Sequence, residues 1–297
     1  MSLPRCCGLK FTYCHLLFTF LHENLEQTGA LTADESAVHV LPYLDMEEVI
    51  RTPREELDAA VQAAKLLPLS EITLLAPIPR PRQDVICLGI NYHAHAEEAA
   101  RYSAESFTKE RPIPIYFSKR VTEAVAPDGF IESHPGLVER LDYEAELAII
   151  IGKTAKDVKA EDAGDYIFGY TVLNDVSARV LQTTHKQWYF GKSLDGFTPI
   201  GPCITTADEI AFPPALKISA SVNGELRQDA TTDLLITGIP AIIEELTSGM
   251  TLLPGTIIAT GTPAGVGMGF DPPKVLKAGD VVECTIEKIG TLRNTVR

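Results

Sequence analysis

Two carboxylates spaced two residues apart are the first feature of the sequence that could do chemistry. In LDYEAELAIIIG (residues 141–152), Glu144 and Glu146 stand in an apolar run that is typical of a buried strand. Side chains alternate faces along a strand, so both carboxylates point the same way. Buried like charges are unfavourable unless something compensates them, as a divalent cation does. The alternative is a solvated polar face on an edge strand, and the spacing alone leaves both interpretations open.

A third carboxylate follows the next apolar run along the chain. Asp175 ends YIFGYTVLND and is a candidate third ligand from another strand end. Three carboxylates without histidine or thiolate favour a hard ion with octahedral habits. This donor set predicts Mg²⁺, with Mn²⁺ or Ca²⁺ as alternatives, rather than Zn²⁺.

A histidine and a glutamate with helical spacing form a second candidate group. In NYHAHAEE, His95 and Glu98 are three residues apart, so they share one face of a helix. A histidine polarised by a carboxylate is suited to draw a proton from water. His93 and Glu97 compete for the same roles. From the spacing alone, an ordinary exposed helix is the better explanation.

Further polar residues lie in segments rich in small or aromatic residues. Lys192 in YFGKSLDGF could offset the carboxylates or bind an anionic substrate, although a surface lysine is the alternative. Arg179 and Gln182 would face the same site if a helix follows Asp175. Thr262 lies in the glycine-rich ATGTPAGVG, which lacks the ending of a P-loop and the spacing of a dinucleotide fingerprint. We therefore predict a loop that presents backbone N–H groups and Thr262 to a substrate oxygen, and no nucleotide site.

The elements that hold these residues are predicted to be mainly strands. Apolar runs indicate buried strands, and Asn223-Gly224 predicts a type I′ hairpin. The helices are few and short, so the pattern is not the alternation of a doubly wound sheet. We expect a mixed α/β, mainly β architecture. The expected strands and helices include VICLGI (85–90), PIYFSK (114–119), LDYEAELAIIIG (141–152), the hairpin LKISASVNGELRQDA and the amphipathic helix TGIPAIIEELTSGM.

A small leading unit is expected before the catalytic part. It contains a strand-like FTFLHENLEQTGALT, then Val38 to Leu44, then a helix from Pro53 to Leu67. A proline-rich linker runs from about Ala76 to Asp84. We divide the chain into a small N-terminal domain (1–80) and a catalytic domain (81–297).

Charge and cysteine content narrow the class of protein. The 297 residues carry a formal charge of −14, which disfavours binding to nucleic acid or to an anionic membrane surface. The N-terminal apolar run (residues 11–21) is too short to span a bilayer, and we favour a first strand over a signal peptide. We expect a cytoplasmic protein with reduced thiols. The six cysteines are Cys6, Cys7, Cys14, Cys87, Cys203 and Cys284.

Six motifs in a fixed order resemble the fumarylacetoacetate hydrolase superfamily. They are LGINYHAHAEE, LDYEAEL, NDVSAR, GKSLDGFTPIGP, VNGELRQ and ATGTPAGVG. The resemblance runs from about Val85 to the C-terminus, and the leading unit resembles the small N-terminal domain of bacterial members. It implies a β-roll of mixed strands, usually a homodimer.

The resemblance also implies roles for individual residues. It makes Glu144, Glu146 and Asp175 the ligands of Mg²⁺ or Mn²⁺. His95 and Glu98 become a water-activating dyad on a helix that closes over the substrate. The resemblance assigns the binding of the substrate and the stabilisation of its negative charge to Tyr92, Gln182, Lys192 and Thr262. The family's substrates are 2-oxo acids whose reactions pass through an enolate.

Two departures from the family pattern concern the substrate. Some relatives carry an arginine where this chain has Ile90, and the usual acidic residue after SAR is Val180. A cation elsewhere could replace the missing arginine. The segment near the predicted lid offers several, most of which we expect at the solvated surface, namely Arg101, Lys109, Arg111, Lys119 and Arg120.

Three hypotheses follow for the function. The first is a Mg²⁺-dependent hydrolase that cleaves a C–C bond in a 2,4-dioxo acid, with His95 activating water. The second is an oxaloacetate-type decarboxylase or a dienoate isomerase or tautomerase on the same site. The third, of another class, is a protein that binds a small acid without turnover.

Overall fold

The computed structural model of the chain describes residues 16–102 and 113–297. Its largest sheet is built from strands of both halves of the sequence. These are β1 (Leu16–His22), β2 (Leu25–Leu31), β3 (Ala37–Val40), β4 (Lys65–Pro68), β5 (Thr73–Leu74), β6 (Val85–Gly89), β7 (Ile115–Lys119), β10 (Ala145–Ile151), β11 (Ile167–Asn174), β13 (Ile200–Thr206) and β16 (Ile257–Ala259). Their order is β4-β3-β2-β1-β13-β11-β10-β16-β6-β7, with β5 paired to β1. Most pairs are antiparallel, whereas β16 and β6 run parallel, so the expected mixed, mainly β architecture is confirmed.

A second sheet and a short ribbon complete the strands of the described chain. Their members are β8 (Phe130–Ile131), β14 (Lys217–Val222), β15 (Glu225–Thr231), β17 (Val281–Ile286) and β18 (Gly290–Val296), with β9 (Leu141–Asp142) and β12 (Ser177–Ala178) in the ribbon. The second sheet has the order β15-β14-β17-β18-β8. Asn223 and Gly224 join β14 to β15 with φ of 53° and 80°. Positive φ at both central residues is the geometry of the predicted type I′ turn.

The helices are short, as the sequence indicates. They are α1 (Met46–Arg51), α2 (Arg54–Ala63), α3 (His93–Tyr102), α4 (Arg179–Thr184), α5 (Tyr189–Lys192) and α6 (Ile239–Gly249), with 3-10 turns at Leu69–Glu71, Ala160–Tyr166, Ala207–Glu209, Thr232–Leu234 and Gly267–Gly269. The predicted amphipathic helix is α6, which buries Ile239, Ile242, Ile243 and Leu246.

Two details of the leading unit differ from the prediction. The strand-like FTFLHENLEQTGALT is a hairpin of β1 and β2, because Glu23 and Asn24 take left-handed φ of 49° and 63° and reverse the chain. The helix predicted from Pro53 to Leu67 ends at Ala63. The following residues form β4 because they pair with β3, and this pairing outweighs the helical spacing.

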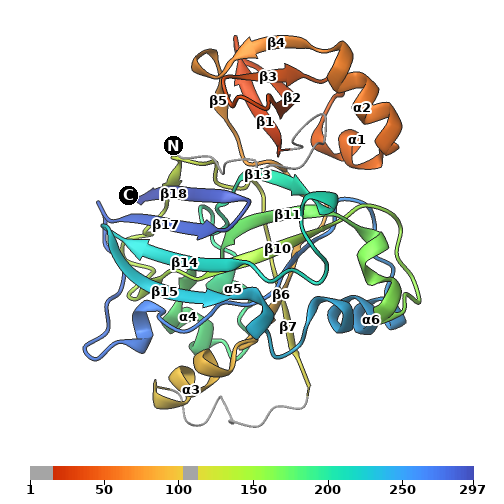
Figure 1. Cartoon of the computed structure of the whole chain (residues 1–297). Helices are drawn as coiled ribbons and strands as arrows, with labels where there is room; N and C mark the ends of the chain where they lie inside the picture. The colour runs from red at the N-terminus through yellow and green to blue at the C-terminus, as the bar shows by residue number, and fades with distance from the viewer. Residues whose placement is uncertain (1–15, 103–112) are drawn as a thin grey trace.

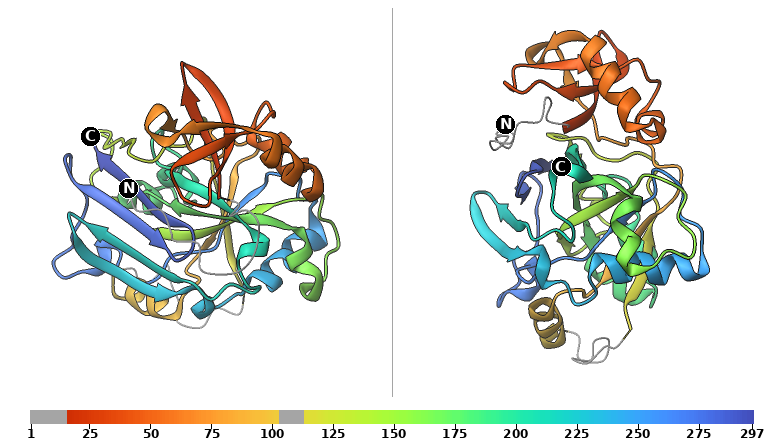
Figure 2. Two further views of the ribbon diagram at one scale, coloured as in Figure 1. Left: turned by 45° about the horizontal axis from the view of Figure 1, so that its top comes forward. Right: turned by 45° about the vertical axis from the view of Figure 1, so that its right-hand side comes forward.

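The leading unit lies at one end of the molecule. Figure 1 shows β1 to β5 with α1 and α2 at the top and α3 at the bottom, and the right-hand view of Figure 2 shows the same separation. Residues 75–84 carry neither helix nor strand. The unit is nevertheless continuous with the large sheet, because β1 pairs with β13. The boundary at residue 80 stays a prediction.

The core surrounds the strands that will hold the site. Every residue of β10 is buried, and β10 lies between β11 and β16. Cys87, Cys203 and Cys284 are buried free thiols, and burial raises the pKa of Cys203 to about 12. Cys6, Cys7 and Cys14 lie outside the described residues, as do Lys109 and Arg111. In the described chain, none of the helices combines the length and apolar character needed to cross a bilayer.

Candidate metal centre and active site

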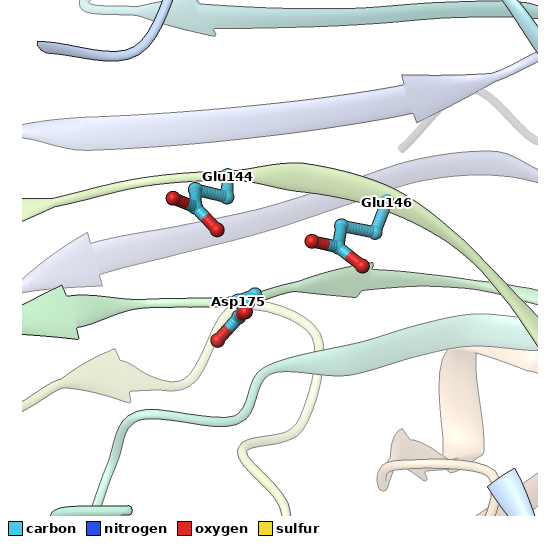
Figure 3. A group of neighbouring side chains, drawn as sticks. All are labelled: Glu144, Glu146 and Asp175. Atoms are coloured by element: carbon cyan, nitrogen blue, oxygen red, sulfur yellow. The ribbon is translucent and has the colours of Figure 1, made fainter. Parts of the chain in front are cut away.

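Three carboxylates meet at the end of the central strands. Glu144 immediately precedes β10, Glu146 is its second residue, and Asp175 directly follows β11. One oxygen from each of the three lies within 4.8 Å of the others, and all three residues are buried. Figure 3 shows both glutamates on one side of their strand, directed toward Asp175. The structure therefore brings the predicted metal ligands together.

Strand register explains why these residues meet. Ala145 pairs with Asn174, so Glu144 and Asp175 are neighbours across the β10–β11 pair. The Asp175 amide donates to the Glu144 carbonyl (2.8 Å), and the Asn174 side chain accepts from the Glu144 amide (3.0 Å). Alternation along the strand brings Glu146 to the same face as Glu144. A one-residue slip of this register would move the glutamates away from Asp175.

Basic side chains compensate two of the three carboxylates. Lys192 Nζ donates to Glu144 Oε2 and to Asp175 Oδ2, both at 2.7 Å. Arg179 Nη1 lies 2.6 Å from Glu144 Oε1. Burial alone would raise the pKa of Glu144, but Lys192 and Arg179 hold that pKa below its usual range. Burial opposes the charge of Lys192, yet Asp175 and Glu144 raise its pKa.

Glu146 stands apart from this compensation. Its Oε2 accepts a hydrogen bond from the Gly261 amide (2.8 Å), and no basic side chain in the described part of the chain forms an ion pair with it. Burial, together with Asp175 and Glu144, raises the pKa of Glu146 well above its usual range. The site thus holds a buried carboxylate that lacks a countercharge.

The donor set fits a divalent cation. The site contains four buried carboxylates, namely Asp142, Glu144, Glu146 and Asp175. In the described part of the chain, the basic side chains paired with them are three, namely Lys119, Arg179 and Lys192, so the ionised carboxylates exceed the positive charges by one. A divalent ion between Glu144, Glu146 and Asp175 would supply that charge. Oxygen-only ligands are those of Mg²⁺, Mn²⁺ and Ca²⁺.

The histidine and glutamate on α3 form the predicted pair. His95 Nδ1 lies 3.0 Å from Glu98 Oε2, and both side chains are buried. Glu98 Oε1 accepts from the Gly265 amide (2.9 Å), which ties the helix to the glycine-rich loop. The competing His93 and Glu97 are exposed. The geometry therefore favours His95 and Glu98, and the Nε2 atom of His95 is left for a substrate.

A cavity of about 550 Å³ joins the pair to the carboxylates. Six of the nine predicted site residues line it, namely His95, Glu144, Glu146, Gln182, Lys192 and Thr262. Glu98 supports the cavity through His95. Asp175 lies behind the wall, where it contacts Lys192.

The remaining predicted substrate contacts differ in their availability. Tyr92 is buried but does not line the cavity, and its hydroxyl finds no hydrogen-bond partner among the described residues. Burial and the nearby Glu146 raise the pKa of Tyr92. Thr262 Oγ1 donates to the Ala145 carbonyl (2.9 Å), so its proton is already engaged. Gln182 accepts from Arg179 Nη1 (3.3 Å), and its amide group is available to a ligand.

Two residues that the sequence analysis did not single out hold the frame of the site. Asp142 is fully buried; it accepts from Arg179 Nε (2.9 Å) and from the Gly267 amide (2.7 Å). Gln228 links the strand to the loop, since it accepts from the Ala145 amide and donates to Thr262. Both lie in quoted motifs. The period of two that joins Asp142 to Glu144 and Glu146 is a signal that could have found the aspartate.

Lys119 contradicts the expectation for most of the cations near the lid. It is fully buried, and its Nζ donates to Asp175 Oδ1 (2.6 Å) and to the Val176 carbonyl (3.1 Å). The next residue, Arg120, is 68% exposed, as expected. Lys119 is the last residue of β7, whereas Arg120 lies just beyond the end of the strand. Arg101 lies on α3, but its side chain is outside the described part.

We expect a Lys119→Met variant to be strongly destabilised, because it leaves Asp175 buried with one cation fewer. Breaking a buried ion pair on one side costs about 3–5 kcal/mol. Urea denaturation of the metal-free protein measures this loss. The matched control is Arg120→Met, whose exposed pair with Asp84 (3.7 Å) is worth about 1 kcal/mol or less. Equal losses in the two variants would refute the assignment.

A methyl group at Gly269 is expected to displace the histidine–glutamate pair. A Cβ there would lie 1.9 Å from Glu98 Oε1. We expect Gly269→Ala to fold but to lose about 10²-fold in kcat, because small misplacements of a positioned group have effects of this size. The control is Gly249→Ala, where a Cβ meets nothing within 4 Å. Steady-state kinetics and circular dichroism on both variants test this prediction, and full activity of Gly269→Ala would contradict it.

Comparison with known proteins defines the class of this protein. The family model for the fumarylacetoacetate (FAA) hydrolase C-terminal region matches residues 84–297. The chain belongs to this family, so the fold and site are those of a fumarylacetoacetate hydrolase family enzyme. The chain is 44% identical to oxaloacetate tautomerase YisK of Bacillus subtilis over 251 residues. This match covers 84% of this chain and 80% of YisK.

Solved structures agree with this placement. Fumarylacetoacetate hydrolase from Exiguobacterium antarcticum is 40% identical with a TM-score of 0.82, over 95% of this chain and 99% of that one. Maleylpyruvate hydrolase from Sphingobium sp. SYK-6, in complex with manganese(II) and pyruvate, is 31% identical with a TM-score of 0.75, over 95% of this chain and 98% of that one.

Proposed function

We propose that this protein is a divalent-metal-dependent oxaloacetate tautomerase, which interconverts the keto and enol forms of a small 2-oxo diacid. The observation that carries the proposal is the His95–Glu98 pair, which shares one cavity with two of the three clustered carboxylates. Tautomerisation needs a group that moves a proton and a site that tolerates negative charge on the 2-oxo oxygen. The cavity offers both.

The chain's own residues divide the work of the reaction. His95 takes the proton from C3 of the keto acid and delivers it to the 2-oxo oxygen to give the enol, and the reverse transfer restores the keto acid. Glu98 holds Nδ1 of His95, which fixes the tautomer and leaves Nε2 toward the substrate. A bound divalent ion supplies Lewis-acid stabilisation of the charge on the 2-oxo and carboxylate oxygens. Lys192 uses two of its three donors on Glu144 and Asp175, so one N–H remains for substrate oxygen.

The names of the relatives support this reaction over the hydrolase that was the first hypothesis from the sequence. YisK, which is named an oxaloacetate tautomerase, is 44% identical to this chain, whereas the two hydrolases of known structure are 40% and 31% identical. Tautomerisation also needs no attacking water between His95 and the substrate. C–C bond hydrolysis is the second candidate, and the manganese and pyruvate bound to the maleylpyruvate hydrolase favour it.

Turnover of purified protein on two substrate classes tests the proposal. We expect loss of the enol absorbance of oxaloacetate in the presence of Mg²⁺ or Mn²⁺, with oxaloacetate recovered intact. Pyruvate and carbon dioxide as products would indicate a decarboxylase instead. Cleavage of acylpyruvates to pyruvate and a second acid would support the hydrolase. Binding of these acids without any of the three reactions would overturn the enzyme assignment.

The expected homodimer is part of the same proposal. A homodimer is the usual assembly implied by the family resemblance. Light scattering on the eluted protein distinguishes a mass near twice 32.3 kDa from a monomer.

A further inference from the structure

The cavity is positively charged at its sides although the whole chain is strongly acidic. The chain carries a formal charge of −14. Among the described residues that line the cavity, the acidic ones are Glu144 and Glu146, whereas the basic ones are Arg140, Arg179, Lys186 and Lys192. Because basic residues outnumber acidic ones in this lining, the cavity is suited to an anionic ligand.

Two of these four cations are already committed. Arg179 binds Asp142 and Glu144, and Lys192 binds Glu144 and Asp175. Arg140 differs from both. Its Nη1 contacts the Met268 sulfur (4.0 Å). The described chain contains no carboxylate paired with Arg140. Its guanidinium therefore has a free fork of donors beside the cavity.

The position of Arg140 relative to the carboxylates suits a small molecule. Its carbonyl accepts from the Arg179 amide (2.9 Å), which fixes its backbone beside α4. Arg140 stands four residues before Glu144, a span of roughly 13 Å when the chain is extended. Both side chains are long and both line the same cavity. Arg140 and the two glutamates therefore border the same cavity, which is available to a substrate.

The cavity lining also contains apolar side chains, among them Ile90, Ile115 and Phe117. A carboxylate at the far end of a substrate would lose hydration against such groups unless a cation met it. Arginine is suited to that role, because its planar fork matches the two oxygens of a carboxylate.

We propose that Arg140 binds the distal carboxylate of the substrate and so selects dicarboxylic over monocarboxylic 2-oxo acids. The inference rests on the proposed function, because it presumes that the 2-oxo acid end lies at the carboxylate cluster. Arg140 acts on specificity and does not itself move a proton. It supplies a positive charge to the cavity that Ile90 also lines.

A pair of substrates that differ in one charge tests this role. Oxaloacetate and its 4-methyl ester share the same carbon skeleton and an activated methylene group, but the ester lacks the distal carboxylate. For Arg140→Met we expect kcat/KM on oxaloacetate to fall about 30-fold, mainly through KM, and kcat/KM on the ester to change less than about threefold. Arg140→Lys, which keeps the charge without the fork, should lie between these limits.

The controls separate a specific contact from a general field. Lys186→Met removes another cavity-lining cation, one without a carboxylate partner among residues 16–102 and 113–297, and should cost oxaloacetate turnover far less than Arg140→Met does. Equal losses in the two variants, or an equal loss on the diacid and the ester, would overturn the proposal. Thermal-shift titration with both ligands adds a binding readout. If wild type discriminates the diacid through Arg140 but does not turn it over, the tautomerase assignment fails and the role of Arg140 stands.

Discussion

A Glu146→Gln variant is expected to lose metal binding and nearly all turnover. Glu146 is the carboxylate of the cluster that lacks a basic partner within the described chain. Its charge is therefore the one that a bound cation would stabilise most. We expect kcat/KM to fall about 10³-fold, which corresponds to about 4 kcal/mol of transition-state stabilisation. The measurement is metal-dependent turnover of oxaloacetate, with calorimetry to follow the binding of Mn²⁺.

The same variant is expected to gain stability in the absence of metal. Burial beside Asp175 and Glu144 raises the pKa of Glu146. A carboxyl whose folded pKa is raised contributes stability below its unfolded pKa, and that contribution is lost as pH rises. Glu146 therefore weakens the metal-free fold as pH rises above the unfolded pKa, and a glutamine, which does not titrate, removes this cost.

Thermal unfolding with and without metal checks both effects at once. Wild type should gain about 2.7 kcal/mol of apparent stability at a Mn²⁺ concentration of 100 Kd, whereas Glu146→Gln should gain none. The matched control is Glu47→Gln, a buried glutamate of the leading unit whose pKa burial also raises. That control should keep both turnover and the metal-induced shift. Full metal-dependent turnover in Glu146→Gln would contradict the account.

A His95→Gln variant is expected to lose turnover while keeping its metal. Removing a positioned acid–base group typically lowers kcat by about 10²–10⁴-fold. The three carboxylates and their lysine partners are untouched, so the shift in unfolding temperature with Mn²⁺ should persist. Stopped-flow decay of the oxaloacetate enol measures the loss, with His93→Gln as the matched control on the exposed face of the same helix.

The partner of the histidine should follow the same logic. Glu98→Gln keeps an oxygen for the Gly265 amide but weakens the hold on His95 Nδ1. We expect an intermediate loss of kcat, and none in the exposed Glu97→Gln. If His95→Gln and His93→Gln behave alike, the proton is moved by another group and the proposed mechanism is wrong.

Strand alternation made the centre of the site predictable. A period of two brings Glu144 and Glu146 to one face, and the register with β11 adds Asp175. Helical spacing predicted His95 and Glu98 as the acid–base pair but did not exclude His93 or Glu97. That choice depends on which face of α3 packs against the glycine-rich loop, which is a tertiary contact.

Other features could not be derived from local patterns. Lys119 is one of several basic residues in its segment, and its burial beside Asp175 depends on where β7 ends. The end of α2 is set by the pairing of β4 with β3, which overrides helical periodicity. The turn at Glu23 and Asn24 lacks the glycine that usually marks such a hairpin. Arg140 lies outside residues 101–120, the segment whose basic residues were the predicted replacements for the missing arginine.

A crystal structure with Mn²⁺ and oxalate tests the central claim most directly. Oxalate resembles the planar enolate of a 2-oxo acid. The account predicts one anomalous-scattering ion bonded to oxygens of Glu144, Glu146 and Asp175 at about 2.0–2.2 Å. It also predicts oxalate in the cavity, on the side that faces His95. An ion bound elsewhere, or a cluster in which Lys119 and Lys192 hold the carboxylates while no ion binds at millimolar Mn²⁺, would contradict it.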